Sequence, residues 1–326
     1  MSAFIASNLA LGAQAEDSLP AKISPPVSAT TAYDRPFSTP TLPAFRDLAP
    51  GAITPEGWLR DWCQTMSQGY TGRMEEVHQA FKQAWSADHR MTGKNLDWHS
   101  GGWPYEGGGY WFEGLTRLAQ ALHDEKLIAH ARQRFEPVIA GIQPDQGVLF
   151  FHWLDRSKPD QVAAAEGLKT PESEWPMWAS GLLGRALVSH YEATRDPRAL
   201  QALERAYSGD PRWIRMGWSP SNLGPAFDTW TWTGNAKIKT AIDEFFAKEG
   251  TNVKGNWSWN RYAKPPKDGA WEDHTDHVVH QIESSVWALG YLWTGKREYL
   301  DAQLAWHEHL VRDGMLPYGV PAMALI

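Results

Sequence analysis

The stretch Thr194-Arg195-Asp196-Pro197-Arg198-Ala199-Leu200 has the composition of a tight turn between two helices. The pattern recurs around 122–127, 233–238 and 294–300. Asp and Asn side chains, here at positions 124, 196 and 235, accept the free backbone N–H groups that open a helix, and proline suits its first turn. Gly234 and Gly295 favour the left-handed conformation that ends a helix. The sequence therefore predicts a series of helical hairpins.

The segments beside these turns have helical periodicity. In 115–122 and 286–293 the apolar residues recur at i, i+3, i+4 and i+7, and no comparable stretch alternates strictly as a half-buried strand does. The sequence predicts an all-α fold, and the repeated hairpins favour an α/α toroid of the six-hairpin barrel type. A solenoid and an ordinary helical bundle remain open. An opening helix is expected after Thr54, with a buried stripe formed by Trp58, Leu59, Trp62 and Met66.

Long segments separate the hairpins, at roughly 88–106, 143–173, 208–226 and 251–274, and they hold most of the Gly, Pro and Trp. A compact fold rarely keeps such connections unless they build a site. The chain has 19 tryptophans, many beside glycine, acids and histidine. Flat apolar rings next to carboxylates suit the C–H faces and hydroxyl edges of a sugar ring, although part of the tryptophan content must be core packing. In a ring of hairpins, these segments would line a central cleft.

Composition narrows the class of protein. The net charge of −7 and the lack of a basic stripe argue against a nucleic-acid partner. No run of about 18 apolar residues is present, so no membrane span is predicted. Cys63 is the only cysteine, which excludes an intrachain disulfide and a zinc site built on several thiolates; a buried, inert thiol is expected there.

The N-terminal region suggests export. Residues 1–15 resemble the end of a signal peptide with a small-x-small cleavage pattern, which predicts a secreted or periplasmic protein. Residues 16–44 are rich in Pro, Ser and Thr, as in a linker or a wrapping arm. Residues 45–326 are expected to form the α/α-barrel domain of catalytic type.

Three segments carry candidate chemistry. In 99–111, Glu106 stands among aromatics on a glycine-rich stretch that leads into a helix, and it is either an acid at a site or a helix cap. In 271–280, His277 and His280 share a helical face. They would donate hydrogen bonds to a polar substrate, bind a metal together with a carboxylate, or form only structural hydrogen bonds. In 172–178, acids precede Trp175 and Trp178 at the start of a helix, and they are either part of a site or first-turn acids that the helix dipole favours.

Glycoside hydrolysis needs one group to protonate the leaving oxygen and a second to act as nucleophile or base. The sequence does not contain a nucleophile elbow, a phosphate-binding loop or a dinucleotide fingerprint. It does offer acids that suit the two roles, and their separation is not predictable from the sequence. These acids are Glu106, Glu174, Asp228, Glu272 and Asp273.

The chain resembles glycoside hydrolase family 127, the β-L-arabinofuranosidase-like proteins, from about residue 42 to the end. The resemblance is carried, in order, by 42–59, by Glu106-x-x-x-Tyr110-Trp111-x-x-Gly114-Leu115, by 191–196, and by His277-x-x-His280 ahead of Thr294-Gly295. It implies a six-hairpin α/α barrel acting on plant-type L-arabinose sugars. It also implies that His277 contacts the sugar and that Glu106 is an acid near the cleft, while His280 stands where the family often has Asn.

The chain also departs from this family. Members use a cysteine nucleophile in a zinc site of three cysteines and a glutamate, which follows the His277 region by a long interval and has no counterpart up to Ile326. Many members carry His and Glu where this chain has Leu182 and Arg185. Roughly nine helices are predicted, fewer than a closed ring requires. We therefore expect an incomplete barrel within a longer protein, with no cofactor in this chain and zinc in the full-length protein by family resemblance.

The sequence thus predicts a glycosidase of carbohydrate metabolism with an oligosaccharide or polysaccharide substrate. The alternatives are a non-catalytic glycan-binding toroid, and a polysaccharide lyase that holds a uronic acid through Arg185, Arg215 or Arg261. The catalytic residues are predicted to be Glu106 and His277, and the substrate-binding residues Trp103, Tyr110, Trp175, Trp178 and His280.

Overall fold

A computed structural model describes residues 35–41, 48–78, 81–82, 85, 103–141, 174–209, 220–248, 278–309 and 311–312 of the 326-residue chain. These residues contain ten α-helices and no β-strand, which confirms the predicted all-α class. Four helices form an inner layer: α4 (Trp103–Leu122), α7 (Glu174–Thr194), α9 (Pro220–Thr233) and α12 (Val278–Thr294). Each is followed by an outer helix: α5 (Glu125–Gly141), α8 (Pro197–Gly209), α10 (Ala236–Lys248) and α13 (Arg297–His309). Two helices precede them, α1 (Gly57–Gln68) and α2 (Tyr70–Val77).

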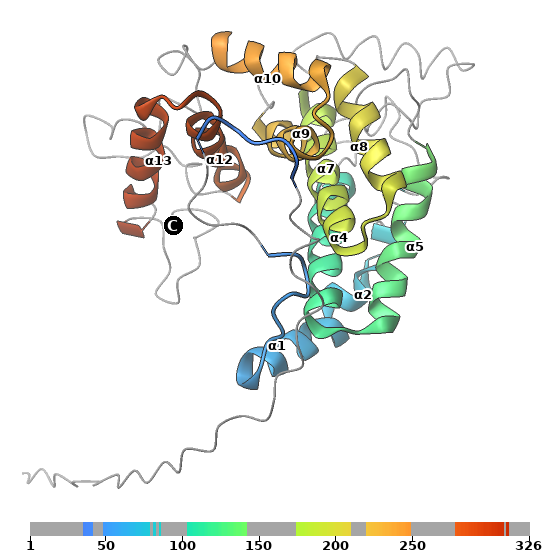
Figure 1. The fold of residues 1–326 in the computed structure, drawn as a ribbon. Coiled ribbons are helices and arrows are strands. Elements are labelled where there is room, and N and C mark those ends of the chain that lie inside the picture. The colour runs from blue at the N-terminus through green and yellow to red at the C-terminus, as the bar shows by residue number, and fades with distance from the viewer. Residues whose placement is uncertain are drawn as a thin grey trace, which may run out of the picture.

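The hairpins follow one another along an arc. α4 packs against α7, α7 against α9 and α9 against α12, while α1 and α2 pack against α4. Figure 1 shows this arc running from α1 at the bottom of the view to α12 and α13 at the upper left. Every inner helix ends at a short turn and begins after a long segment. The long segments therefore connect to the beginnings of the inner helices, and the short turns connect to their ends.

The turns repeat one hydrogen-bond pattern. The threonines at the ends of α7, α9 and α12 each donate a hydroxyl hydrogen bond to the carbonyl four residues earlier, at 2.6–2.9 Å. Each hydroxyl also accepts the N–H group two residues later at 3.2 Å. The residue between them is left-handed, with φ of 55° at Arg195, 64° at Gly234 and 70° at Gly295, and His123 takes the same place after α4 with φ of 52°. The predicted glycine turns are confirmed.

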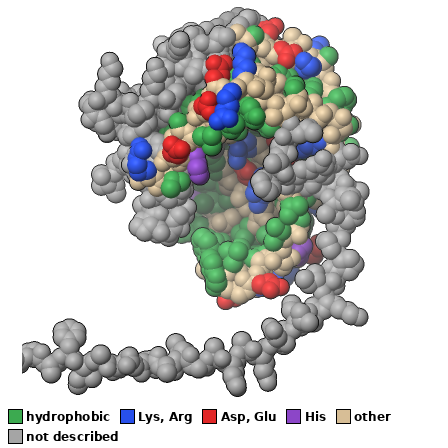
Figure 2. All heavy atoms as spheres, turned by 60° about the vertical axis from the view of Figure 1, so that its left-hand side comes forward, with side chains coloured by type: hydrophobic (Ala, Val, Ile, Leu, Met, Phe, Trp, Pro, Cys, Tyr) green, Lys and Arg blue, Asp and Glu red, His purple; other side chains and the backbone are tan. Residues whose placement is uncertain are grey.

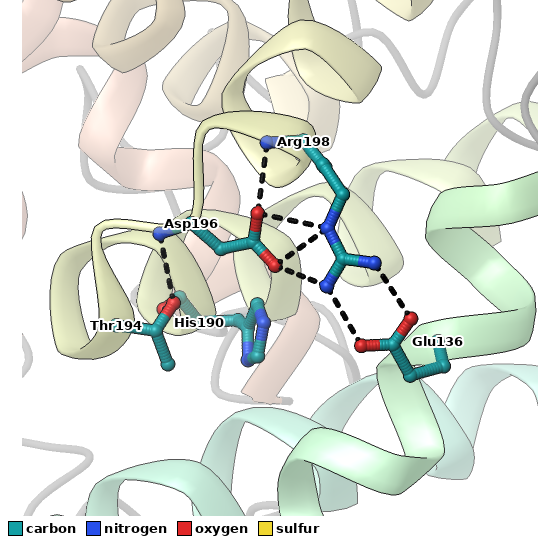
Figure 3. A network of polar contacts seen from close by, with 5 residues as sticks. All are labelled: Glu136, His190, Thr194, Asp196 and Arg198. Atoms are coloured by element: carbon teal, nitrogen blue, oxygen red, sulfur yellow. Dashed lines mark hydrogen bonds and ion pairs between the residues drawn. The ribbon is translucent and has the colours of Figure 1, made fainter.

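The predicted caps are present at the next residue of three turns. Asp124 Oδ1 accepts from the N–H groups of Lys126 and Leu127, and Asn235 Oδ1 accepts from that of Lys237 at 2.9 Å. At the third turn, Figure 3 shows Asp196 accepting the Arg198 N–H while the Arg198 guanidinium bridges Asp196 and Glu136. These side chains satisfy N–H groups that a helix start leaves free.

The core lies between the two layers and is strongly aromatic. Seven of the nine tryptophans whose side chains the structure describes are buried in it, namely Trp85, Trp111, Trp230, Trp232, Trp287, Trp293 and Trp306. Edge-to-face contacts connect several of them, as between Trp230 and Trp293 with ring centroids 4.6 Å apart. The Trp230–Trp232 pair and Trp111 are therefore packing residues.

Small residues bring the inner helices into close contact. A Cβ atom on Gly109 of α4 would lie 2.7 Å from Leu182 Cβ of α7, and one on Gly181 would lie 2.6 Å from the Ser221 backbone of α9. A Cβ atom on Gly184, one turn after Gly181, would lie 3.2 Å from Pro225 Cβ of α9 and 2.2 Å from the Tyr207 hydroxyl oxygen. Because the contacts advance in the same direction along both helices, α7 and α9 are parallel. These close contacts hold the beginnings of α4, α7 and α9 together.

Four local expectations are corrected. The predicted buried stripe of α1 is exposed: Trp58 is 75% and Trp62 55% accessible, Leu59 is also exposed, and Met66 is half-buried, because α1 has no helix on that face among the described residues. Cys63 beside them is also only half-buried. The glycine run at 107–109 lies inside α4, and α9 already begins at Pro220, because tight packing against α7 offsets the poor helix propensity of glycine.

Candidate active site

The candidate site lies where the inner helices begin. The first turns of α4, α7, α9 and α12 receive the four long segments, and these segments contain most of the residues singled out from the sequence. In the space-filling view of Figure 2, the concave side of the arc is hollowed, with hydrophobic side chains along its lower rim and charged side chains deeper inside. The arc therefore has an open concave side.

Glu106 is the one predicted catalytic residue whose side chain the structure describes. It lies in the first turn of α4 and is 8% exposed. Its carboxyl group makes no hydrogen bond or ion pair with the described residues. Burial raises the pKa of Glu106 to about 7, because the charged form loses its hydration. The N-terminus of α4 favours the charged form, but burial dominates.

This environment explains what Glu106 can do chemically. A carboxyl group with a pKa near 7 is partly protonated at neutral pH, so it can donate a proton as well as accept one. An N-terminal carboxylate that only stabilised the helix would gain most by remaining ionised in water. The burial of Glu106 therefore favours a role as an acid over the alternative of a helix cap, which was left open by the sequence.

Helix α7 brings the backbones of two predicted substrate-binding tryptophans to the level of Glu106. The contact between Gly109 and Leu182 aligns α4 with α7, and three residues earlier on each helix are Glu106 and Ala179. Trp175 and Trp178 precede Ala179 in the first turns of α7, and Trp103 is the first residue of α4. The backbones of these tryptophans therefore lie at the same end as Glu106, while their side chains are outside the described residues.

The remaining predicted residues divide into two groups. His280 is in the first turn of α12, with its side chain outside the described part, and His277 directly precedes that helix and lies outside it entirely. Tyr110 is described: its ring packs against the core and its hydroxyl oxygen is buried. Its phenol therefore faces the protein interior.

Two residues considered from the sequence are engaged elsewhere. The Arg185 guanidinium forms hydrogen-bonded ion pairs with Glu113 of α4, with Nε 3.2 Å from Oε2, so it connects two helices. Asp228 lies in the second half of α9, where it binds Arg35. Leu182 is buried against α4. Arg215 and Arg261 are outside the described residues.

A cluster of buried polar side chains near the start of α9 was not predicted from the sequence. Ser180, Ser221 and Asn222 are each 1% exposed, and the Tyr207 hydroxyl donates to Asn222 Oδ1 at 3.3 Å. Burial raises the pKa of Tyr207, so the phenol stays protonated. The only signal in the sequence is the Pro-Ser-Asn stretch at 220–222, which reads equally well as a helix start. These side chains pack α7, α8 and α9 against one another.

Within the described residues, no set of three or more His, Cys, Asp or Glu side chains is arranged to hold a metal ion. None of the described helices combines the length and apolar character that crossing a membrane requires. Comparison with known proteins gives no match among family models, curated proteins or solved structures.

Proposed function

We propose that this chain is a carbohydrate-active hydrolase in which Glu106 is the proton donor to the glycosidic oxygen. The observation that carries the proposal is the buried carboxyl group in the first turn of α4, with a pKa of about 7. Cleavage of a glycosidic bond requires a carboxyl group that is still protonated near neutral pH. Its place at the end reached by the tryptophan-rich segments supports a sugar as the substrate.

The arrangement of helices supports an α/α toroid as the framework. Four inner helices, each followed by an outer helix, follow an arc in sequence order, as consecutive sectors of a toroid do. The tight contacts at Gly109 and Gly181 hold the inner helix beginnings in register. A rigid scaffold of this kind suits a first-turn carboxyl group that must meet a bound sugar in a fixed geometry.

The second reacting group is proposed to come from the same end. Asp228 is excluded from this role by its ion pair with Arg35 in the second half of α9. Glu174 is the first residue of α7, while Glu272, Asp273 and His277 immediately precede α12. The family resemblance suggests an L-arabinofuranosyl oligosaccharide as the substrate, and the signal-peptide-like residues 1–15 suggest a secreted protein.

The test compares two glutamates that each lie in the first turn of a helix. Glu106→Gln removes the proton donor, whereas Glu125→Gln changes the exposed first-turn glutamate of α5. Both variants and the unmodified protein are incubated with arabinosides and with uronic polymers, and the released sugars are measured. We expect arabinoside hydrolysis to fall by about 10²–10⁴-fold in Glu106→Gln only.

Three results would contradict the proposal. Equal hydrolysis by Glu106→Gln and the unmodified protein would remove Glu106 from the reaction. Binding of glycans by the unmodified protein without cleavage would favour a glycan-binding protein. Release of an unsaturated product from the uronic polymer would favour a lyase.

A further inference from the structure

Residues 35–41 cross the ends of the inner helices opposite Glu106. The Phe37 N–H donates to the Thr231 carbonyl at 3.2 Å, and the Thr41 N–H donates to the Leu292 carbonyl at 3.3 Å. Both carbonyls belong to the last turns of α9 and α12, where a helix leaves its C=O groups without helical partners. The segment is the short blue stretch beside α9 and α12 in Figure 1. We refer to residues 35–41 as the strap.

The side chains of the strap also pack against these helix ends. The Phe37 ring centroid is 6.2 Å from that of Trp230, and the ring lies directly over Gly234. Thr39 is buried, and its hydroxyl donates to the carbonyl of Thr41 at 2.7 Å within the strap. The strap is therefore anchored on α9 and α12 by both backbone and side-chain contacts.

Arg35 begins the strap and inserts its guanidinium between α7 and α9. Nη1 is 2.5 Å from Asp228 Oδ1 and 2.9 Å from Thr231 Oγ1, while Nη2 is 3.4 Å from Glu192 Oε1. The guanidinium carbon lies 4.7 Å from the centre of the Trp232 ring. Glu192 is 8% exposed and Arg35 itself 23% exposed, so the guanidinium is largely removed from water.

This pocket matches a guanidinium group in shape as well as charge. Two carboxylates and a hydroxyl accept from the forked N–H donors, and an indole face covers the flat cation. The Tyr191 ring packs edge-on against Trp232 with centroids 4.8 Å apart, which fixes the orientation of the indole. The pocket also lies near the C-terminal ends of two helices, where the helix dipole favours a cation.

We propose that Glu192, Asp228, Thr231 and Trp232 form a guanidinium-binding pocket, and that Arg35 occupies it to hold the strap closed over α9 and α12. The occupant belongs to the same chain, so the pocket connects a segment far from the helices in sequence to two inner helices, α7 and α9. Because α7 and α9 supply opposite sides of the pocket, Arg35 also fixes the spacing of these two helices. The pocket is separate from the candidate active site, and the proposal does not depend on the proposed reaction.

The test measures release of the strap in the full chain. Chymotrypsin cleaves after Phe37 only when the strap leaves the helix ends, and the Phe37–Ser38 cut is quantified by mass spectrometry. We expect Arg35→Ala to increase this cleavage rate about tenfold or more, because the variant loses a partly buried ion pair. Arg297→Ala is the matched control: Arg297 also pairs with an aspartate, but it is 72% exposed and distant from the pocket in sequence. This control should leave the Phe37 cut unchanged.

Chemical rescue identifies the ligand class. Methylguanidinium at millimolar concentration should slow the Phe37 cut in Arg35→Ala, whereas methylammonium at the same concentration should not. Asp228→Asn combined with Arg35→Ala should abolish the rescue. Arg35→Lys keeps the charge without the fork and should release the strap faster than the unmodified chain, which tests the proposal even if Arg35→Ala does not fold. Unchanged cleavage in both Arg35 variants, or equal rescue by the two cations, would overturn the proposal.

Discussion

Gly234 and Gly295 occupy the same position in two successive turns, with φ of 64° and 70°, but their surroundings differ. A Cβ atom on Gly234 would lie within 2.2 Å of the Phe37 ring, whereas a Cβ on Gly295 would meet only the Thr41 hydroxyl at an ordinary 3.5 Å. Gly295 is therefore required only by the turn, whereas Gly234 also leaves room for the Phe37 ring of the strap.

This difference predicts unequal effects of the same substitution. Gly295→Ala should lower the free energy of unfolding by about 1 kcal/mol, the penalty of a left-handed alanine. Gly234→Ala should lower it further, because the added methyl group collides with Phe37. Urea denaturation of both variants measures the difference. In a Phe37→Ala background the two losses should become equal, and a persistent difference would place the clash elsewhere.

The buried Glu106 carboxyl predicts a stability penalty at neutral and alkaline pH. Its pKa is about 7 in the folded chain against about 4.5 in the unfolded chain, so the folded state retains the proton longer. Stability therefore falls as the pH rises from 4.5 to 7 and then stays constant. Glu106→Gln should be more stable than the unmodified chain by up to about 3 kcal/mol at pH 8 and equal to it at pH 4.

Urea denaturation at both pH values measures this difference, with Glu125→Gln as the exposed control. A destabilised Glu106→Gln at pH 8 would show that the ionised carboxylate has a stabilising partner. Together with the activity test, the experiment separates a functional carboxyl group from a structural one.

The contribution of His190 to the stability of the fold should depend on pH in the opposite sense. Its imidazole is buried and stacks on Phe135 of α5 with ring centroids 4.4 Å apart. Burial lowers the pKa of His190 to about 4, against about 6.5 when unfolded, so the unfolded chain takes up the proton first. Its contribution is constant above pH 6.5, and the stability falls as the pH drops from 6.5 to 4.

His190→Phe keeps an aromatic ring on Phe135 but cannot be protonated. The stability difference between this variant and the unmodified chain should shift in favour of the variant by up to about 3 kcal/mol between pH 8 and pH 4. Denaturation curves at the two pH values provide the measurement. A difference that does not change with pH would mean that His190 is solvated in the folded chain.

Substitution of two glycines of α4 by alanine should change the stability of the chain in opposite directions. Gly109 contacts the Leu182 side chain and backbone, so a methyl group there would separate α4 from α7. Gly114 has open space around its Cβ position. We expect Gly109→Ala to destabilise the chain by about 2 kcal/mol and Gly114→Ala to stabilise it by up to about 1 kcal/mol through helix propensity. Thermal or urea denaturation tests both, and stabilisation by Gly109→Ala would refute the close helix contact.

The exposed face of α1 predicts hydrophobic surface in solution. Trp58 and Trp62, one turn apart, are both more than half accessible. A double substitution to serine should reduce binding of a hydrophobic dye and any self-association, with little loss of stability because neither ring is in the core. Dye fluorescence and light scattering provide the readouts, and unchanged dye binding would locate the apolar surface elsewhere.

The sequence predicted the helical class and the turns because both depend on neighbouring residues. The left-handed positions at Gly234 and Gly295 and the caps at Asp124, Asp196 and Asn235 were predicted because each makes its defining hydrogen bonds within a few residues. The prediction of α1 was half right: the helix exists, but its apolar stripe is exposed, because periodicity shows which residues share a face and not whether another element covers it.

The same contrast between local and long-range interactions holds for the candidate site. The sequence identified Glu106 as an acid among aromatics but left open whether it was a cap, because the pKa of a carboxyl group depends on burial by distant residues. The assignment of Asp228 as a possible catalytic acid missed its partner, since Arg35 lies nearly two hundred residues earlier in the chain.

By itself, the sequence determined the hairpins, their turns and which residues deserve chemical attention, since these follow from local hydrogen bonding and side-chain chemistry. Tertiary structure alone decided that the glycine run is helical, that α1 presents its tryptophans to water, and that Arg35 rests between α7 and α9. Each of those outcomes depends on desolvation and close packing between segments that the chain brings together only when it folds.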